Sequence, residues 1–117
     1  MSDEVAWVLE MNVKPGELDN WTALMREMVG ATKANEPGTL AYQWFIDGST
    51  CHLYERYVDS DAVMVHLGAF GEHFAERFLA AADPSSFLVY GDPSAAVREA
   101  LAGMGPRYLA TLGGFAR

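Results

Sequence analysis

The sequence predicts an α+β domain of the ferredoxin-like class, with a four-stranded antiparallel sheet and the order β-α-β-β-α-β over about residues 5–90. Apolar strand segments alternate with segments of helical periodicity, and Asp47-Gly48, a dipeptide favoured in tight hairpin turns, separates two of the strands. The chain has 117 residues, half of them hydrophobic, which is enough for one core. We expect a single domain over 1–117, with its core at about 5–90 and an extension at about 94–117.

The first strand is predicted over Val5–Val13, an almost continuous apolar and β-branched run that ends before Pro15-Gly16. A helical period begins at Glu17, with apolar residues recurring along one side. This helix must stop by Asn35-Glu36-Pro37-Gly38, because proline cannot continue a helix. The Pro-Gly pair there predicts a type II turn.

The hairpin strands are predicted over Thr39–Ile46 and Thr50–Val58. A short helix follows, capped by Asp59 or Ser60 and ending near residue 67. A second helical piece carries phenylalanines at positions 70, 74 and 78, which share one side of a helix, and it extends to residue 84.

Gly68 and Gly71 lie between these two helical pieces and predict a break there. A fourth strand is expected over Ser86–Tyr90, and Ser94 is expected to cap a helix that ends at about residue 101. Arg107–Leu112 is a candidate for a last strand.

The strands carry apolar residues on both faces. On the first strand, Trp7 and Leu9 point to one face, while Ala6 and Val8 point to the other. A sheet with helices on one face normally leaves its other face polar and wet. The simplest cover for a second apolar face is the same face of another copy, so the pattern predicts a homodimer.

Composition limits the partners. Sixteen acidic and eight basic residues give a net charge of −8, which repels phosphate backbones and anionic membranes. We therefore expect no nucleic-acid or membrane partner. The N-terminus has no signal-peptide pattern, no apolar stretch has the length of a membrane span, and Cys51 has no second cysteine to pair with. A cytoplasmic protein is predicted.

Three segments and one histidine resemble the antibiotic biosynthesis monooxygenase domain. They are Glu36-Pro37-Gly38-Thr39-Leu40-Ala41-Tyr42, Leu53-Tyr54-Glu55-Arg56-Tyr57, Asp59-Ser60-Asp61-Ala62-Val63, and His66. The resemblance covers about residues 5–90 and implies a dimeric α+β barrel, in which two sheets pack face to face. Relatives include quinol and anthrone oxygenases that use molecular oxygen without metal, flavin or haem, and others that degrade haem or process signal molecules.

We expect no cofactor. The chain has no G-x-G-x-x-G after a strand and no phosphate-binding loop, and His66 and His73, seven residues apart, lack a third metal ligand. The haem-degrading relatives carry an asparagine on the first strand, where this chain has Leu9.

The resemblance implies oxygen chemistry on a quinol or phenol, which must first become an electron-rich anion. His66 matches a histidine that recurs in the family and is the predicted base. Arg56 is the predicted oxyanion partner. The alternatives are a surface or capping role for His66 and an ion pair of Arg56 with Glu10 or with a second subunit.

Six further residues are predicted to bind the substrate: Asn12, Tyr42, Trp44, Tyr54, Tyr57 and His73. The aromatic members would line a pocket and bind phenolic oxygens, and Asn12 would orient a carbonyl. The alternative is that these aromatics are ordinary sheet core or dimer interface.

The predicted function is a cofactor-independent monooxygenase that acts, with molecular oxygen, on a quinol-like or polycyclic phenolic substrate. Two alternatives stay open at this point. One is an isomerase or lyase that uses the same residues on a small carbonyl compound. The other is a non-catalytic dimer that binds a small molecule.

Overall fold

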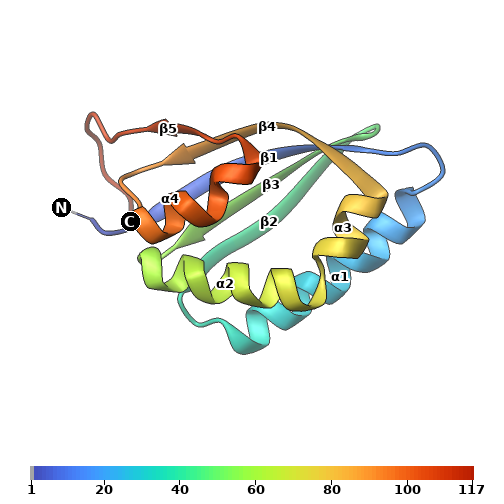
Figure 1. The fold of residues 1–117 in the computed structure, drawn as a ribbon, viewed down its shortest axis with the longest axis horizontal. Coiled ribbons are helices and arrows are strands. Elements are labelled where there is room, and N and C mark those ends of the chain that lie inside the picture. Colours follow the sequence, from blue (N-terminus) through green and yellow to red (C-terminus); the bar gives the residue numbers. More distant parts are fainter. Residues whose placement is uncertain (1) are drawn as a thin grey trace.

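The computed structural model describes residues 2–117 and shows a twisted sheet whose one face is covered by helices (Figure 1). The strands lie in the order β2-β3-β1-β4-β5. In chain order the elements are β1 (Val5–Val13), α1 (Leu18–Asn35), β2 (Thr39–Asp47), β3 (Thr50–Tyr57), α2 (Ser60–His73), α3 (Ala75–Ala81), β4 (Ala82–Tyr90), α4 (Ala95–Leu101), the 3-10 helix η1 (Ala102–Met104) and β5 (Arg107–Leu109).

The predicted ferredoxin-like order is confirmed. β1 is central and pairs antiparallel with both β3 and β4, while β2 pairs with β3 as the predicted hairpin. The expected four-stranded sheet gains a fifth strand, β5, at the candidate last strand Arg107–Leu112, although β5 ends at Leu109. β5 pairs with β4 in parallel, with Leu88 opposite Arg107, because α4 carries the chain across before it returns beside β4.

The break between the second and third helices falls at Phe74 instead of at the two glycines. Gly68 and Gly71 lie inside α2, which runs on to His73. Phe74 leaves the helical conformation with φ −127°, and its N–H still donates to the carbonyl of Phe70. A glycine weakens a helix by only about 1 kcal/mol, so packing of the apolar side chains outweighs it.

β4 begins at Ala82, four residues before the predicted start, and includes Pro84. Pro84 lies opposite Met11, next to a register shift between Glu10 and Met11. β5 pairs only with residues 88–90, so β4 is an edge strand at Pro84, and an edge strand is where a sheet tolerates proline.

Two side-chain caps set the positions of α2 and α4. The Asp59 carboxylate accepts from the N–H of Ala62 at 2.8 Å, and the Ser94 hydroxyl accepts from the N–H of Val97 at 3.3 Å. The N–H of Ser94 also donates to the Ser60 hydroxyl at 2.9 Å. The first turns of these helices are therefore joined, which places α4 beside α2.

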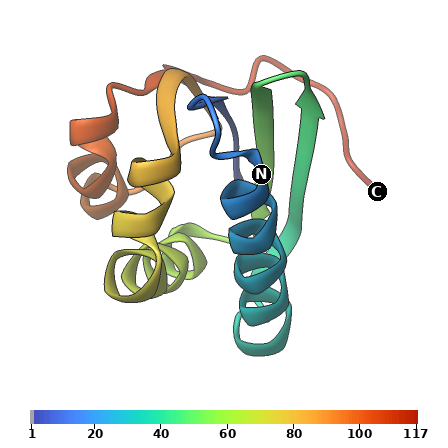
Figure 2. The ribbon, with the colours of Figure 1, turned by 90° about the vertical axis from the view of Figure 1, so that its right-hand side faces the viewer.

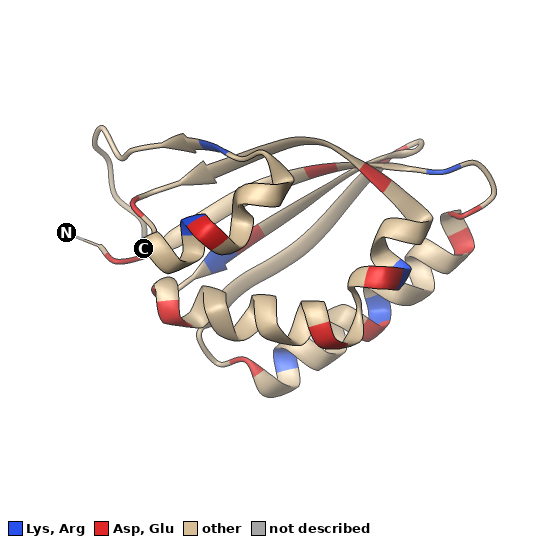
Figure 3. Ribbon diagram, in the orientation of Figure 1, with Lys and Arg blue, Asp and Glu red and all other residues tan. Residues whose placement is uncertain are grey.

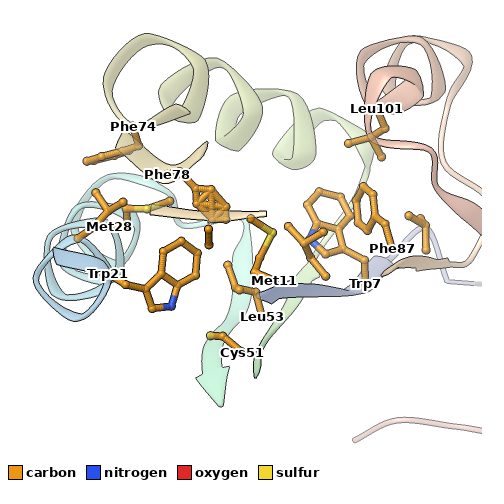
Figure 4. Packing of buried hydrophobic residues seen from close by; sticks show 14 of the residues in the cluster. Trp7, Met11, Trp21, Met28, Cys51, Leu53, Phe74, Phe78, Phe87 and Leu101 are labelled. Atoms are coloured by element: carbon orange, nitrogen blue, oxygen red, sulfur yellow. The ribbon is translucent and has the colours of Figure 1, made fainter. Parts of the chain in front are cut away.

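The core lies between the sheet and its helices, and Figure 4 shows its aromatic and sulfur-containing side chains packed from several elements. The other face of the sheet carries no helix, and the C-terminal tail descends on that side (Figure 2). Phe45, which lies opposite His52 on that face, is 56% exposed in the single chain, so the face is uncovered and carries both apolar and polar side chains.

Acidic residues are spread over the helices, strands and loops, and the fewer basic ones are scattered among them (Figure 3). Within residues 2–117, no helix has both the length and the apolar character that crossing a membrane requires.

Candidate active site

A cavity of about 80 Å³ lies between the sheet and the helices. Its floor consists of two neighbouring rows of side chains that run across the sheet. Each row contains residues that lie directly opposite one another on adjacent strands. Tyr42, Glu55 and Trp7 lie opposite one another across β2, β3 and β1, and Leu53, Leu9 and Phe87 form the next row across β3, β1 and β4. The roof consists of Met28, His66, Leu67, Phe70, Phe78, Leu79, Leu101 and Met104.

The polar end of the cavity is built around His66 on α2. Its Nδ1 lies 2.8 Å from Oε1 of Glu36, and its Nε2 lies 3.2 Å from Oε1 of Glu55. All three side chains are buried, at 4–7% exposure. Burying an imidazole and two carboxylates removes three polar groups from water, which costs free energy. Packing alone does not account for such a cluster, so it is a candidate functional group.

Glu36 lies in the turn between α1 and β2. Its carbonyl accepts from the N–H of Thr39 at 3.1 Å, and its carboxylate accepts from the Thr39 hydroxyl at 3.3 Å. The predicted type II turn is wrong, because Gly38 does not have the positive φ that such a turn requires. Gly38 is needed for space instead: an added Cβ would lie 2.7 Å from Cβ of Ala62 on α2. This close approach brings Glu36 within reach of His66.

Glu55 is a carboxylate on the helix-facing side of β3. Besides His66, it accepts a 2.5 Å hydrogen bond from the hydroxyl of Tyr57. Burial, followed by the charge of Glu55, raises the pKa of Tyr57 well above its usual value, so Tyr57 stays a neutral donor. Both contacts use Oε1, which leaves Oε2 to accept from a ligand in the cavity that Glu55 lines.

His66 is positively charged at neutral pH. Burial alone lowers the pKa of this histidine, but hydrogen bonds to Glu36 and Glu55 and their negative charges outweigh burial and raise the pKa to about 9. An imidazolium donates protons and cannot accept one, so His66 does not fit the expected role of a free base. Of the two carboxylates that contact His66, Glu55 is the one that lines the cavity.

Tyr42 completes the polar end. Its ring meets the His66 ring edge to face, with 5.1 Å between centroids. Burial and then the charge of Glu55 raise the pKa of Tyr42 well above its usual value, so its hydroxyl remains a donor. Glu55 and Tyr42 thus both line the cavity, beside His66 and among apolar walls.

Arg56 does not join this group. It lies on the helix-free face of β3, where its guanidinium forms a two-pronged pair with the Glu4 carboxylate at 2.8 and 2.9 Å. Glu10 was the ion-pair partner of Arg56 expected from the sequence. Its Oε2 lies 3.3 Å from Nε2 of His52 instead. Within one chain, the sheet separates Arg56 from the cavity.

The other predicted site residues are dispersed. Asn12 and Tyr54 belong to the helix-free face, and His73 is exposed at the end of α2. Trp44 packs against Trp21 and Phe78 in the core, which is the alternative considered from sequence. The structure therefore gathers His66, Tyr42 and Tyr57 at one place, with the Trp44 ring beside Tyr42 at 6.1 Å between centroids, and leaves Asn12, Tyr54 and His73 elsewhere.

Sequence reasoning missed Glu36 and Glu55 as site residues. Glu55 shares its side of β3 with Leu53 and Tyr57, and both neighbours are fully buried. A lone acid within a buried apolar stripe was the available signal, because an unpaired carboxylate is very costly there. Within residues 2–117, no three His, Cys, Asp or Glu side chains are grouped so as to hold a metal ion.

A ferredoxin-like sheet with helices on one face and a cavity between the two layers defines the class, a ferredoxin-like α+β protein. The chain belongs to the antibiotic biosynthesis monooxygenase family, whose sequence model matches residues 5–83. The resemblance seen in the sequence is thereby confirmed. Among curated proteins, none matches the chain.

Several solved structures share the fold. MupZ from Pseudomonas fluorescens is 24% identical, with a TM-score of 0.88 over 99% of this chain and 96% of its own. SnoaB from Streptomyces nogalater, described as a cofactor-independent oxygenase, is 18% identical, with a TM-score of 0.64 over 80% of this chain and 96% of its own. A conserved Methanosarcina mazei protein is 17% identical, with a TM-score of 0.65 over 74% and 90%. At these identities the likeness concerns the fold.

Proposed function

We propose that this protein is a cofactor-independent monooxygenase that oxidises a phenolic or quinol-like aromatic compound bound in the cavity. The observation that carries the proposal is the pairing of the Glu55 acceptor with the Tyr42 donor at the polar end of an otherwise apolar cavity. Membership of the family and the fold shared with SnoaB, a described cofactor-independent oxygenase, support the reaction type.

In this proposal Glu55 removes a proton from the substrate and Tyr42 donates a hydrogen bond to the oxyanion that forms. The His66 cation, 3.2 Å from Glu55, remains paired with Glu36 when Glu55 becomes protonated. The total charge of the cavity is the same before and after the transfer, since the negative charge moves from Glu55 to the substrate. Apolar walls exclude water and strengthen these interactions.

The substrate anion supplies the electrons. When an aromatic methylene next to a phenol becomes a carbonyl, one atom of oxygen enters the substrate. The other oxygen atom leaves as water with the two hydrogens that the methylene loses. Atoms and electrons therefore balance with substrate and dioxygen alone, and the residues need only form and hold the anion.

Oxygen uptake tests this function. The purified chain is mixed with anthrone and with a panel of reduced quinones, and oxygen consumption is followed with an electrode against the uncatalysed rate. We expect an enzyme-dependent rate with at least one aromatic substrate and its loss in Glu55→Gln. An unchanged rate in that variant would contradict the role of Glu55.

A second candidate function uses the same two residues. A carboxylate base beside a hydroxyl donor is also what proton transfer next to a carbonyl requires, and no oxygen is consumed. Solvent deuterium exchange into a cyclic ketone under anaerobic conditions, followed by NMR, would identify such an isomerase. Binding without exchange or oxygen uptake would identify a non-catalytic binding protein.

We also propose that two chains associate through their helix-free sheet faces. A shallow hollow on that face is lined by apolar and aromatic side chains together with three polar ones: Val8, Phe45, Ile46 and Tyr54, and Asp47, Thr50 and His52. Phe45 leaves more than half of its surface exposed in the single chain, and burying such area contributes about 25 cal/mol per Å². Self-association would cover this face while the cavity stays on the other side of the sheet.

A further inference from the structure

The C-terminal tail, residues 110–117, is not covered by the rest of its own chain. Every residue of the tail is exposed, and none of them lies in a helix or a strand. Two of them carry large apolar side chains: Leu112 is 103% exposed and Phe115 is 82% exposed. The chain that carries these side chains does not bury them, so their burial needs another molecule.

The tail begins at a defined place in the fold. The carbonyl of Leu109, just before the tail, accepts from the N–H of Gly91 at 3.0 Å, and Gly91 lies against the Glu4 carbonyl next to the start of β1. From there the tail passes to the helix-free side of the sheet (Figure 1, Figure 2). The likeness to MupZ covers 99% of this chain and so extends into the tail, whereas the family match ends at residue 83.

The hollow on the helix-free face lies toward the other end of the sheet. Phe45, Ile46 and Asp47 line it next to the β2–β3 turn, and the first two are 56% and 52% exposed. β1, which spans nine residues or about 30 Å, separates the start of the tail from this turn. Because Phe115 is exposed, it does not fill the hollow of its own chain.

Twofold symmetry can bring a tail to a hollow. Two identical chains usually associate about a twofold axis, which makes each contact occur twice. When that axis lies between two sheets and runs across their strands, the start of β1 in one chain lies over the β2–β3 turn of the other. The tail of one chain then begins beside the hollow of its partner.

The tail and the hollow are also chemically complementary. The Arg117 guanidinium lies 4.8 Å from the centre of the Phe115 ring, so the tail presents a cation together with an apolar ring. The hollow presents Phe45 and Ile46 with the Asp47 carboxylate beside them. Within residues 2–117, Asp47 forms no ion pair, so its carboxylate is available to a cation from another chain.

We propose that the tail of each chain docks in the hollow of a second copy, with Phe115 against Phe45 and Ile46 and with Arg117 beside Asp47. The two copies thereby exchange their tails across the helix-free faces. The inference rests on the proposed association through those faces, and it is independent of the monooxygenase reaction.

NMR of a mixed dimer tests the contact directly. Chains with 13C-labelled methyl groups are combined with unlabelled chains, and an isotope-filtered experiment then detects contacts between copies only. We expect contacts between the Phe115 ring of the unlabelled copy and the Ile46 methyl groups of the labelled copy. Contacts of Phe115 within its own chain only, or no contacts at all, would overturn the inference.

Sedimentation equilibrium measures what the tail contributes. Each dimer loses the contact twice, so Phe115→Ala should raise the dimer dissociation constant by roughly 10–100-fold. Val65→Ala is the matched control, because Val65 is an apolar residue on α2 that is 57% exposed and lies away from the helix-free face. It should keep the parent constant.

Exchanging the charges provides an independent readout. Arg117→Glu should weaken association by roughly threefold to tenfold, and adding Asp47→Lys in the same chain should restore it, because opposite charges then face one another again. A loss of folding would not be restored in this way. A dimer that neither Phe115→Ala nor Arg117→Glu weakens would leave the sheet-to-sheet association standing and would overturn the role of the tail.

Discussion

Glu55 and Tyr42 lie directly opposite one another in the β2–β3 ladder, so both side chains stand on the helix-facing side of the sheet. Their neighbourhood follows from the hairpin register, and both side chains also contact His66. Residues paired in this way have Cβ atoms about 5 Å apart, close enough for both side chains to touch one small ligand. The hairpin turn at Asp47-Gly48 therefore sets the geometry of the candidate site.

Replacing Glu55 removes the proposed base. Glu55→Gln should lower turnover roughly 10²–10⁴-fold, because that is the usual contribution of a positioned base. Glu10→Gln is the matched control, since Glu10 lies on the helix-free face near His52 and should keep the parent rate. Initial rates of oxygen uptake, normalised to folded protein by circular dichroism, measure both. Similar rates in the two variants would argue against Glu55.

Removing the hydroxyl of Tyr42 tests the oxyanion donor. Tyr42→Phe should reduce kcat roughly 10²–10³-fold with a smaller change in KM, because the hydrogen bond strengthens as the anion forms. Tyr54→Phe removes the same atom from the opposite face of the sheet and should leave kcat unchanged. A change in KM alone for Tyr42→Phe would assign this residue to binding.

Stability should decline with pH because of His66. The pKa of this histidine rises from 6.5 to about 9 on folding, so its stabilising contribution is complete below pH 6.5 and is lost as pH rises through 9. In this window the free energy of unfolding should fall by on the order of 1 kcal/mol per pH unit. Urea unfolding at pH 6, 7, 8 and 9 measures the slope, and His66→Gln should flatten it. An equal slope in the variant would mean that other groups cause it.

Gly38 is required where the turn after α1 approaches α2. Gly38→Ala places a methyl group 2.7 Å from Cβ of Ala62 and should cost about 1–3 kcal/mol, the usual range for overpacking. Gly30→Ala is the control: Gly30 lies within α1 with open space around its Cα and should gain up to about 1 kcal/mol from helix propensity. Chemical denaturation compares the two. If Gly38→Ala were as stable as the parent, the close approach would not be limiting.

The helix-free face should mediate dimerisation. Light scattering at micromolar concentration should give twice the mass of the chain, and Phe45→Glu should shift it toward the monomer, because a charge would enter an apolar interface. Val65→Glu, which changes a residue on α2 that is 57% exposed, should remain dimeric. A parent chain that is monomeric under these conditions would refute the sheet-to-sheet arrangement.

Local patterns were sufficient for most of the fold. The predicted first strand has the same bounds as β1, and Asp59 and Ser94 cap the helices as expected. These features depend on side chains close in the sequence. The pairing of β5 with β4 and the helix break at Phe74 were not predicted, because both depend on packing between segments that are distant in the chain.

For the site, the sequence by itself determined which residue types were available and that Glu55 and Arg56 point to opposite sides of their strand. It also indicated His66 and Tyr42, through the resemblance to the family. Only the tertiary structure decided that the carboxylate of Glu36, thirty residues before His66, lies 2.8 Å from Nδ1 of that histidine and that Arg56 pairs with Glu4 away from the cavity. The physical reason is that the charge of a buried histidine depends on which carboxylates surround it in space, and local sequence does not encode those distances.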